Sequence, residues 1–361
     1  MVNLTGRTYT LGSIANIPIK VHWSFGLLIL FVGYIAYSND IPQSDLGWFF
    51  GYVGVLFVFV IMHEFGHALM ARSYGVETKD VIISPIGGVA RLQSMPDLPS
   101  QELMIAIAGP GVNVVLLILL IGIQLISQHE LLPDANQFMI SSSEDFIGYL
   151  IWINIALVGF NMIPAFPMDG GRVLRAALAM GLQDRLRATR IASIIGQLFA
   201  VVFVGLGLFA NQYVLMFVGI FVFVTARTEY RQMRLLSRLQ STTVRQVMRR
   251  EFTILHPEEP ISKAFDISPN RSFLVVDSSD QVVGAVPELF VNDARQNNEG
   301  HLQVRHRMST SIGNLGPEMS LETAFNAMNQ LGWTIAPVLD SNSLIIGVID
   351  RSILERYFRS H

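Results

Sequence analysis

The sequence "VFVIMHEFGHALMARSYG" (Val58–Gly75) places three ionisable side chains at the end of a long apolar segment. Residues 49–58 are almost wholly apolar, and they lead without a break into His63, Glu64 and His67. A charged residue at the centre of a membrane helix costs about 2.5–3.5 kcal/mol on insertion scales, so such groups are functional by default. The alternative is that the three groups are solvated near the end of a helix.

The composition is typical of a membrane protein. The chain has 361 residues, of which 51% are hydrophobic and 15% are charged, and it contains no Cys. A soluble protein carries about 25% charged residues. The lack of Cys excludes a disulfide framework, a thiolate metal site and a cysteine nucleophile. The net charge of −3 argues neither for nor against nucleic acid. We expect the basic run at 227–238 to lie at the membrane surface, and we expect no nucleic-acid partner.

Six apolar segments approach the length of about 20 residues that a spanning helix needs. They lie at roughly 23–38, 48–71, 103–127, 146–166, 191–210 and 212–226. Only Asn211-Gln212 separates the last two, which favours antiparallel helices joined by a tight turn. The first twenty residues contain no apolar run, so we expect no cleavable signal peptide before the first segment. The predicted fold is a polytopic α-helical membrane domain with about six transmembrane helices.

Lys and Arg residues indicate the orientation in the membrane. All 14 of those in residues 1–238 fall on the N-terminal segment, on the second–third and fourth–fifth loops, or after the sixth apolar segment. The other loops carry only acidic charges, among them Glu130 and Asp134. The positive-inside rule then places both termini in the cytosol. We expect a multi-pass protein of a prokaryotic cell membrane.

Residues 239–361 have no apolar run of spanning length, and they contain an internal repeat. "PEEPISKAF" (257–265) matches "PEMSLETAF" (317–325) at an offset of 60, and "DSSDQVVG" (277–284) matches "DSNSLIIG" (340–347) at an offset of 63. Each unit predicts a helix, a strand, a turn and a second strand. The expected division is a transmembrane domain at 1–226, a basic juxtamembrane linker at 227–240, and a cytosolic α/β domain at 241–361 with repeats at about 241–300 and 301–361.

His63 and His67 are spaced i, i+4, so on a helix their imidazoles lie on one face, one turn apart. The H-E-x-x-H pattern therefore supplies two ligands to one metal ion and places Glu64 beside it as a general base. A catalytic zinc ion also needs a third protein ligand and an open position for water. The pattern predicts a zinc site whose third ligand comes from another segment.

The candidate third ligand is Asp169, in "FNMIPAFPMDGGR" (160–172) at the end of the fourth apolar segment. It follows Pro164 and Pro167, which cannot continue a helix, and Gly170-Gly171 after it free the backbone. Non-helical chain at membrane depth is tolerated where it lines a cavity. Both segments approach the cytosolic leaflet at these residues, so we expect Asp169 to meet the two histidines. A solvated Asp in a turn is the alternative.

These motifs resemble the site-2 protease family of intramembrane zinc metalloproteases. His63-Glu64-Phe65-Gly66-His67 matches the family's H-E-x-x-H, and 161–170 matches its N-x-x-P-x-x-P-x-D-G element. Ala108-Gly109-Pro110 with Asn113 is similar to its third-helix signature. The resemblance implies one zinc ion per chain, bound by His63, His67 and Asp169. It also implies that Glu64 is the catalytic base and that Asn161 helps to hold the substrate backbone.

The resemblance further implies how the substrate binds. "VIISPIGGVARL" (81–92) predicts two short strands around Pro85 and Gly87-Gly88. In the family this hairpin dips into the membrane and pairs with the unwound substrate as an added strand, which makes Gly87, Gly88 and Val89 candidate substrate-binding residues. From the sequence alone, an ordinary surface hairpin remains an open alternative. The implied substrate is a single-span membrane protein or a signal-peptide remnant.

Residues 241–361 resemble the paired cystathionine-β-synthase-type (CBS) repeats that some branches of the family carry. Such pairs commonly bind adenine nucleotides through a Thr or Ser three residues after a strand glycine and an Asp three residues further on. In this chain Gly284 is followed at those positions by Pro287 and Phe290, and Gly347 by Asp350 and Ile353. We therefore expect ATP or AMP to bind weakly or not at all. Regulation, substrate docking or homodimer formation are the expected roles of the pair.

Two other functions stay open. A metal or ion transporter regulated by the CBS pair would also place His, Glu and Asp inside the membrane. Against it, the membrane part has no inverted internal repeat, and transport does not need a general base beside two metal ligands. A catalytically inactive relative that only binds membrane proteins is the other alternative, and the complete His-Glu-His-Asp set speaks against it. The sequence favours a zinc metalloprotease that acts within the lipid bilayer in regulated intramembrane proteolysis.

Overall fold

The computed structural model describes residues 7–85, 87–93, 96, 98–127, 131–132, 143–267, 272–279 and 281–359. Glu130 and Asp134, in the loop between the third and fourth apolar segments, lie outside these residues. The chain divides into two compact units, Met1–Tyr230 and Arg231–His361, and each is described by itself.

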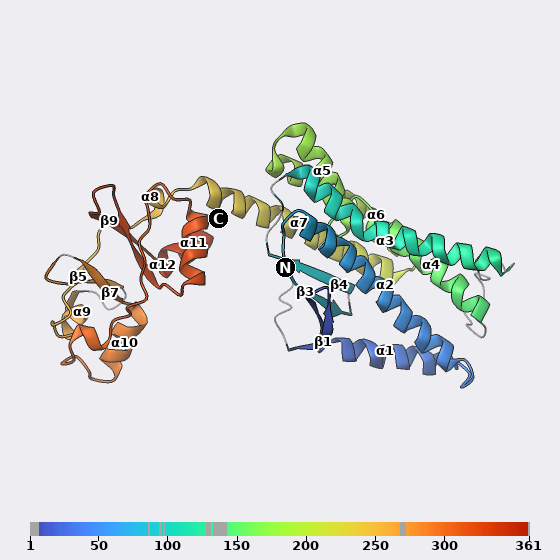
Figure 1. Ribbon diagram of the computed structural model, residues 1–361, viewed down its shortest axis with the longest axis horizontal. Coiled ribbons are helices and arrows are strands. Elements are labelled where there is room, and N and C mark those ends of the chain that lie inside the picture. Colours follow the sequence, from blue (N-terminus) through green and yellow to red (C-terminus); the bar gives the residue numbers. More distant parts are fainter. Residues whose placement is uncertain are drawn as a thin grey trace. The chain divides into compact units, whose positions relative to one another are not determined.

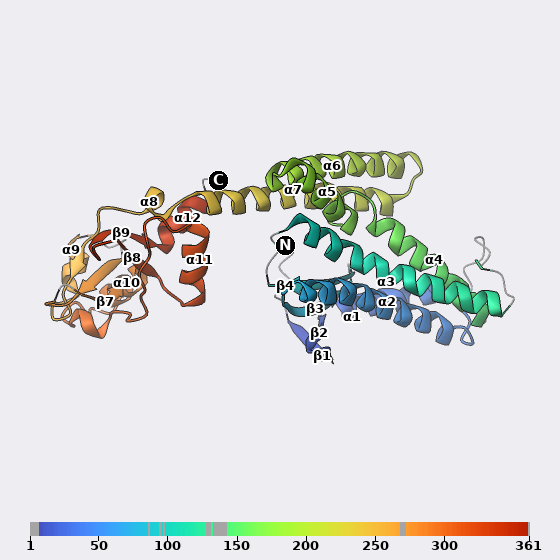
Figure 2. The ribbon, with the colours of Figure 1, turned by 45° about the horizontal axis from the view of Figure 1, so that its top comes forward.

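Helices dominate the first unit (Figure 1). They are α1 (Phe25–Ser38), α2 (Leu46–Ser73), α3 (Pro99–Ile126), α4 (Ser143–Asn161), α5 (Asp169–Leu182), α6 (Arg185–Phe209) and α7 (Tyr213–Ser241), the last of which continues into the second unit. Figures 1 and 2 show α2 and α3 side by side. Among the described residues, the four helices α2, α3, α6 and α7 are long and apolar enough to cross a membrane, whereas α1 and the apolar part of α4 are shorter. The predicted multi-helix membrane domain is confirmed, and the count of six spans stays a prediction.

A four-stranded sheet lies beside α2. It consists of β1 (Thr8–Ile14), β2 (Ile17–His22), β3 (Thr78–Ser84) and β4 (Gly87–Leu92), in that order across the sheet. β2 runs parallel to β3, whereas β1–β2 and β3–β4 are antiparallel pairs. Residues 81–84 and 87–92 thus lie in the β3–β4 pair, and the depth of this pair in the membrane stays a prediction.

A small apolar core holds the sheet against α2, and a cluster of charged side chains links its strands. Buried side chains of β2 and β3 pack against α2, and these are Ile17, Ile19, Val81 and Ile83 against Phe65 and Ala68. Asp80 of β3 is buried and accepts hydrogen bonds from Nε of Arg91 at 2.6 Å and from Nζ of Lys20 at 2.7 Å. The hydrogen bond from Arg91, with that from Lys20, holds the pKa of Asp80 below its usual value. The cluster ties three strands together and fixes β4 beside α2.

α5 is an element that was not predicted from the sequence. The prolines and glycines predict non-helical chain at Asp169 and a freed backbone at Gly170-Gly171, but these residues form the first turn of a helix. The buried positions of α5 recur at helical spacing, at Gly171, Arg175 and Ala179. A buried arginine in this stripe hides the pattern, because an arginine is read as a loop or surface residue.

The second unit is built from two similar halves. The first half contains α8 (Val244–Val247), β5 (Ile254–Leu255), α9 (Ser262–Ile267), β6 (Phe273–Val276), β7 (Val282–Val286) and α10 (Glu288–Gln296). The second contains a 3-10 turn (Val304–His306), α11 (Leu321–Gln330), β8 (Ile335–Leu339), β9 (Ile345–Asp350) and α12 (Arg351–Arg359). Each half reaches across to the other, because Arg249 pairs with Val348 and Ser309 pairs with Ala285. These two bridges are related by offsets of 60 and 63 residues, the same offsets that separate the repeated sequence motifs.

Candidate metal centre

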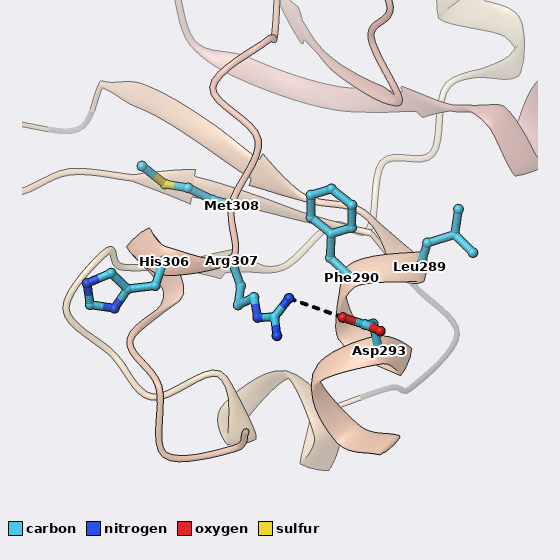
Figure 3. Close-up of a pocket in the computed structure, with 6 residues that line it drawn as sticks. All are labelled: Leu289, Phe290, Asp293, His306, Arg307 and Met308. Atoms are coloured by element: carbon cyan, nitrogen blue, oxygen red, sulfur yellow. Dashed lines mark hydrogen bonds and ion pairs between the residues drawn. The ribbon is translucent and has the colours of Figure 1, made fainter. Parts of the chain in front are cut away.

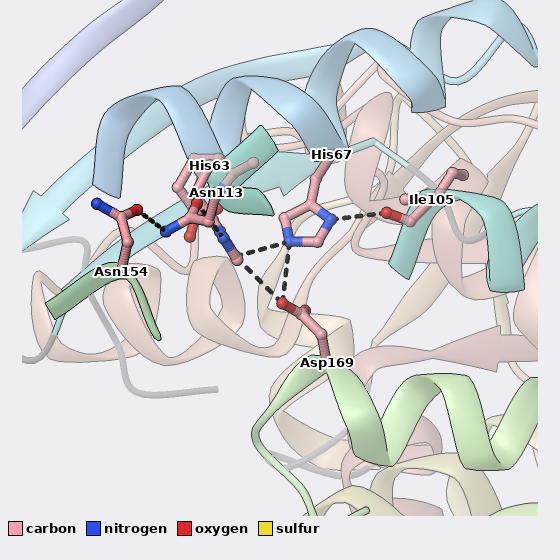
Figure 4. Close-up of polar contacts among 8 residues, drawn as sticks. His63, His67, Ile105, Asn113, Asn154 and Asp169 are labelled. Carbon is pink, nitrogen blue, oxygen red and sulfur yellow. Dashed lines mark hydrogen bonds and ion pairs between the residues drawn. The ribbon is translucent and has the colours of Figure 1, made fainter. Parts of the chain in front are cut away.

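Three side chains from two helices meet in the interior of the first unit. His63 and His67 project from α2, and Asp169 reaches them from the first turn of α5 (Figure 4). Nε2 of His63 lies 3.1 Å from Oδ2 of Asp169, Nε2 of His67 lies 3.2 Å from the same oxygen, and the two Nε2 atoms are 3.1 Å apart. All three side chains are buried.

The group fits a zinc ion in both spacing and chemistry. A tetrahedral zinc ion with bonds of about 2.0–2.1 Å holds its ligand atoms about 3.3 Å apart. The three ligand atoms here are 3.1–3.2 Å apart, close to that value. Two imidazole nitrogens and a carboxylate oxygen are a donor set that catalytic zinc sites use. Within the described part of the chain, it is the one group of at least three His, Cys, Asp or Glu residues arranged to hold a metal ion.

The other ring nitrogen of each histidine determines which nitrogen faces the metal position. Nδ1 of His67 lies 2.7 Å from the carbonyl oxygen of Ile105, and Nδ1 of His63 lies 3.1 Å from Oδ1 of Asn113. Both partners are carbonyl oxygens, which only accept, so each Nδ1 carries the proton and donates it. Each Nε2 is left with a free lone pair, as a metal ligand requires.

Asn113 is itself oriented by a second amide. Its Nδ2 donates to Oδ1 of Asn154 at 3.2 Å, and Nδ2 of Asn154 donates to the carbonyl oxygen of Leu150 at 2.9 Å. Asn113 and Asn154 are fully buried. A chain of hydrogen bonds therefore runs from α4 through α3 to His63 on α2.

Gly109 lets α3 approach the two imidazoles. A Cβ atom at this position would lie 2.2 Å from Nε2 of His67 and 2.8 Å from Nε2 of His63. Any side chain there would occupy the space next to the ligand nitrogens. Gly109 belongs to the third-helix signature of the sequence, and this contact explains why glycine stands there.

Glu64 faces the edge of the sheet. The backbone N–H of Ala90 donates to its Oε2 at 2.8 Å, and a Cβ atom on Gly88 would lie 2.6 Å from its Cγ. The carboxylate is half-buried, one residue from His63 on the same helix. The candidate base therefore lies between the metal ligands and β4.

The remaining residues predicted for the site lie outside the ligand group. Asn161 is the last residue of α4 and is half-buried, and its side chain forms no hydrogen bond with the described residues. Gly87 and Val89 lie on β4 beside Gly88, and Val89 is exposed. Three contributors to the site were missed from the sequence, and these are the Ile105 carbonyl, Asn154 and the Ala90 N–H. Two of them are backbone groups, which no residue-type pattern reveals.

Two segments of the chain match the models of known protein families. Residues 51–206 match the model of peptidase family M50, and residues 244–288 match that of the CBS domain. The first match contains all the proposed metal ligands and Glu64. The second covers the first of the two C-terminal halves.

The sequences of two relatives align with most of this chain. The zinc metalloprotease of Methanocaldococcus jannaschii is 34% identical over 253 residues, which cover 70% of this chain and 69% of that protein. A second relative, from Synechocystis, also carries the name zinc metalloprotease. It is 29% identical over 301 residues, which cover 76% of this chain and 75% of that protein. The solved structure of the site-2 protease from Methanocaldococcus jannaschii is 33% identical, with a TM-score of 0.45 and coverage of 62% of this chain and 95% of that one.

Proposed function

Because the chain belongs to peptidase family M50, the site-2 protease family, we propose that His63, His67 and Asp169 bind its zinc ion and that Glu64 is its general base. The protein is an intramembrane zinc metalloprotease with a C-terminal CBS domain. One observation carries the assignment of roles: three buried ligand atoms have the spacing of a zinc site, and the adjacent residue of α2 is a carboxylate. The transporter alternative is not favoured, because the matching family and the named relatives are peptidases.

Hydrolysis adds one water molecule across the scissile C–N bond. Its oxygen bonds to the carbonyl carbon, and the C–N bond breaks to release the amine. Glu64 accepts a proton from the water and passes it to the leaving nitrogen. The zinc ion, when bound, supplies Lewis-acid polarisation of the scissile carbonyl and of the water. We propose that Asn161 and the part of β4 at Gly87, Gly88 and Val89 line the position of the substrate backbone beside this base.

The proposed topology has six spans, α1, α2, α3, α4, α6 and α7, with both termini in the cytosol of a prokaryotic cell. The distribution of all 14 Lys and Arg residues of 1–238 supports it, as do the archaeal and cyanobacterial relatives. α1 has only 14 residues, so it spans with help from its flanking residues or from a locally thinner bilayer. In this topology the substrate is a single-span membrane protein or a signal-peptide remnant.

We propose the chain divisions 1–226 for the protease, 227–240 for a basic linker and 241–361 for a tandem CBS domain. Support for the tandem comes from the reciprocal bridges between the two halves. The linker belongs to α7, so it is a helical connection. In this proposal the tandem serves regulation, substrate docking or homodimer formation.

The decisive variant is Glu64→Gln, which removes the proton acceptor and keeps the size of the side chain. Its peptidase activity should fall by about 10²–10⁴-fold, the usual contribution of general acid–base catalysis. Zinc content, measured by elemental analysis of the purified protein, should stay at one per chain. In cells, a single-span protein should accumulate in membranes of the variant relative to wild type. Near wild-type peptidase activity would disprove the role of Glu64.

Variants of the ligands provide the matched comparison. His63→Ala, His67→Ala and Asp169→Asn should lose activity and zinc together, because each removes one of three ligands. Zinc retained at full occupancy in any one of them would remove that residue from the ligand set.

A further inference from the structure

A free edge of the sheet faces the catalytic carboxylate. β4 is the last strand of the four, so one of its edges has no strand partner among the described residues. Along an antiparallel strand, successive residues direct their backbone groups alternately toward and away from the partner. Ala90 directs its N–H to Glu64, away from β3, so Gly88 also presents its backbone groups to the free edge. Val89, paired with Ile82, directs its backbone groups into the sheet.

An extended substrate on this edge would use the group that Glu64 already occupies. Strand addition joins carbonyl oxygens of the incoming chain to N–H groups of the edge. The Ala90 N–H lies 2.8 Å from Oε2 of Glu64, a full hydrogen bond. A Cβ atom on Gly88 would lie 2.6 Å from Cγ of Glu64, so the space between this side chain and the strand is too small for a methyl group. A substrate carbonyl can therefore reach the Ala90 N–H only if the carboxylate leaves it.

We propose that Glu64 occupies the place of a substrate carbonyl at Ala90 in the free enzyme, and that docking of the substrate strand on β4 displaces the carboxylate toward the attacking water. The Ala90 N–H then binds a carbonyl oxygen of the substrate. Along the free edge, Ala90 is the next residue after Gly88 whose backbone groups face the substrate. Glu64 becomes available for proton transfer only when a backbone is present to be cut. This inference rests on the proposed function, because it assumes that Glu64 is the base and that substrate adds to β4.

The first test separates substrate binding from positioning of the base. Ala90→Pro removes the N–H, and proline is tolerated on an edge strand where the N–H faces outward. The test uses the Glu64→Ala background, in which no carboxylate competes for this N–H. There, adding Ala90→Pro should weaken binding of fluorescein-labelled casein, an unfolded chain, about five-fold, because a neutral hydrogen bond to substrate is lost. Equal casein affinity of Glu64→Ala with and without Ala90→Pro would overturn the proposal.

The control for this variant is Leu11→Pro on β1. It places a proline in the opposite edge strand of the same sheet, at an exposed residue inside a register shift. Added to Glu64→Ala, it should leave casein affinity unchanged. Zinc content and thermal stability of both proline variants should match those of Glu64→Ala before binding is compared.

The second test needs no proline. Glu64→Gln keeps an acceptor that competes for the Ala90 N–H, whereas Glu64→Ala removes the competitor. Casein should bind Glu64→Ala about five-fold more tightly than Glu64→Gln, as measured by fluorescence anisotropy of the full-length proteins in detergent. Equal or weaker binding to Glu64→Ala would overturn the displacement. An inactive wild type would instead contradict the proposed function, and this binding comparison would still decide whether Glu64 and substrate compete.

Discussion

His63 is oriented by an amide, and the amide is oriented by another. Asn113 accepts from Nδ1 of His63 and donates to Asn154, and both asparagines are fully buried. Partners of this kind fix the tautomer and the ring orientation of a metal-bound histidine. Asn113→Ala should therefore weaken zinc binding by about 10–100-fold without removing a ligand. Competition with a chelator of known zinc affinity measures this change.

The matched control is Asn326→Ala, on the exposed face of α11 in the second unit. Zinc affinity in this variant should equal that of wild type. An unchanged affinity in Asn113→Ala would show that His63 keeps its orientation without the amide.

The side chains of the metal centre could be predicted from the sequence to different degrees. His63, Glu64 and His67 form a pattern within five residues, and Asp169 stands out because it is an acid at the end of an apolar segment. Asn113 entered only through the resemblance to a family. Asn154 is one amide within an apolar helix, and its role depends on a contact with α3 that no spacing along the chain encodes.

Four helices are joined by an ion network beside the Asp169 turn. Arg175 of α5 is fully buried, and its Nε donates to Glu102 of α3 at 2.6 Å while its Nη1 donates to Glu229 of α7 at 2.7 Å. Arg185 of α6 donates to the second oxygen of Glu102 at 2.7 Å. The Arg175 guanidinium also lies 5.2 Å from the centre of the Phe166 ring, which precedes the turn that carries Asp169. The network therefore fixes α5 against α3, the helix that orients both histidines.

Arg175→Met should destabilise the first unit strongly. It leaves Glu102 buried with one cation in place of two, and breaking a buried ion pair costs about 3–5 kcal/mol. The free energy of unfolding, measured by titration of the folded protein with SDS, should fall by that amount. Arg187→Met, which removes an exposed pair with Asp184, should change it by less than about 1 kcal/mol. Equal effects of the two substitutions would show that the buried network adds no stability.

Elements could be predicted where their pattern is local. The apolar segments and the β3–β4 pair were found because length and alternation lie within single stretches of sequence. β1 and β2 were missed. They pair with each other, and β2 joins the larger sheet by pairing Ile19 with Val81, some sixty residues away, which no local pattern reveals. α5 was missed because a buried Arg175 is stable only through partners on α3 and α7.

In the whole molecule, a protease unit is followed by a pseudo-symmetric unit of two repeats. Each repeat contributes one strand pair, β6–β7 or β8–β9, and each receives a bridging segment from the other. The exchange means that neither repeat completes its sheet alone. The offsets of 60 and 63 residues show that the second repeat follows the first in structure as well as in sequence.

A cleft between α10 and residues 306–308 of this unit lies next to Pro287 and Phe290, which replace the expected nucleotide-binding residues of the first repeat. It has a volume of about 420 Å³ and is lined by Leu289, Phe290, Asp293, His306, Arg307 and Met308 (Figure 3). Phe290 stands where an aspartate would hold a ribose. Arg307 is paired with Asp293, at 3.1 Å from its Nη1, and with Glu299. The guanidinium is already neutralised, so the cleft offers little attraction to a phosphate.

Titration of the full-length protein with ATP, ADP and AMP by calorimetry should therefore give dissociation constants no tighter than about 1 mM, equivalent to about −4 kcal/mol. Two physical reasons combine: an aromatic ring replaces the ribose acceptor at Phe290, and the Arg307 charge is satisfied by carboxylates that a nucleotide would have to displace. Asp293→Asn supplies the matched test, because it removes one of these carboxylate charges and leaves the cleft its shape. AMP should then bind at least about ten-fold more tightly than to wild type, since a charge-assisted hydrogen bond is worth about 1.5–3 kcal/mol. A micromolar dissociation constant in the unmodified protein would contradict this account and make the second unit a nucleotide sensor.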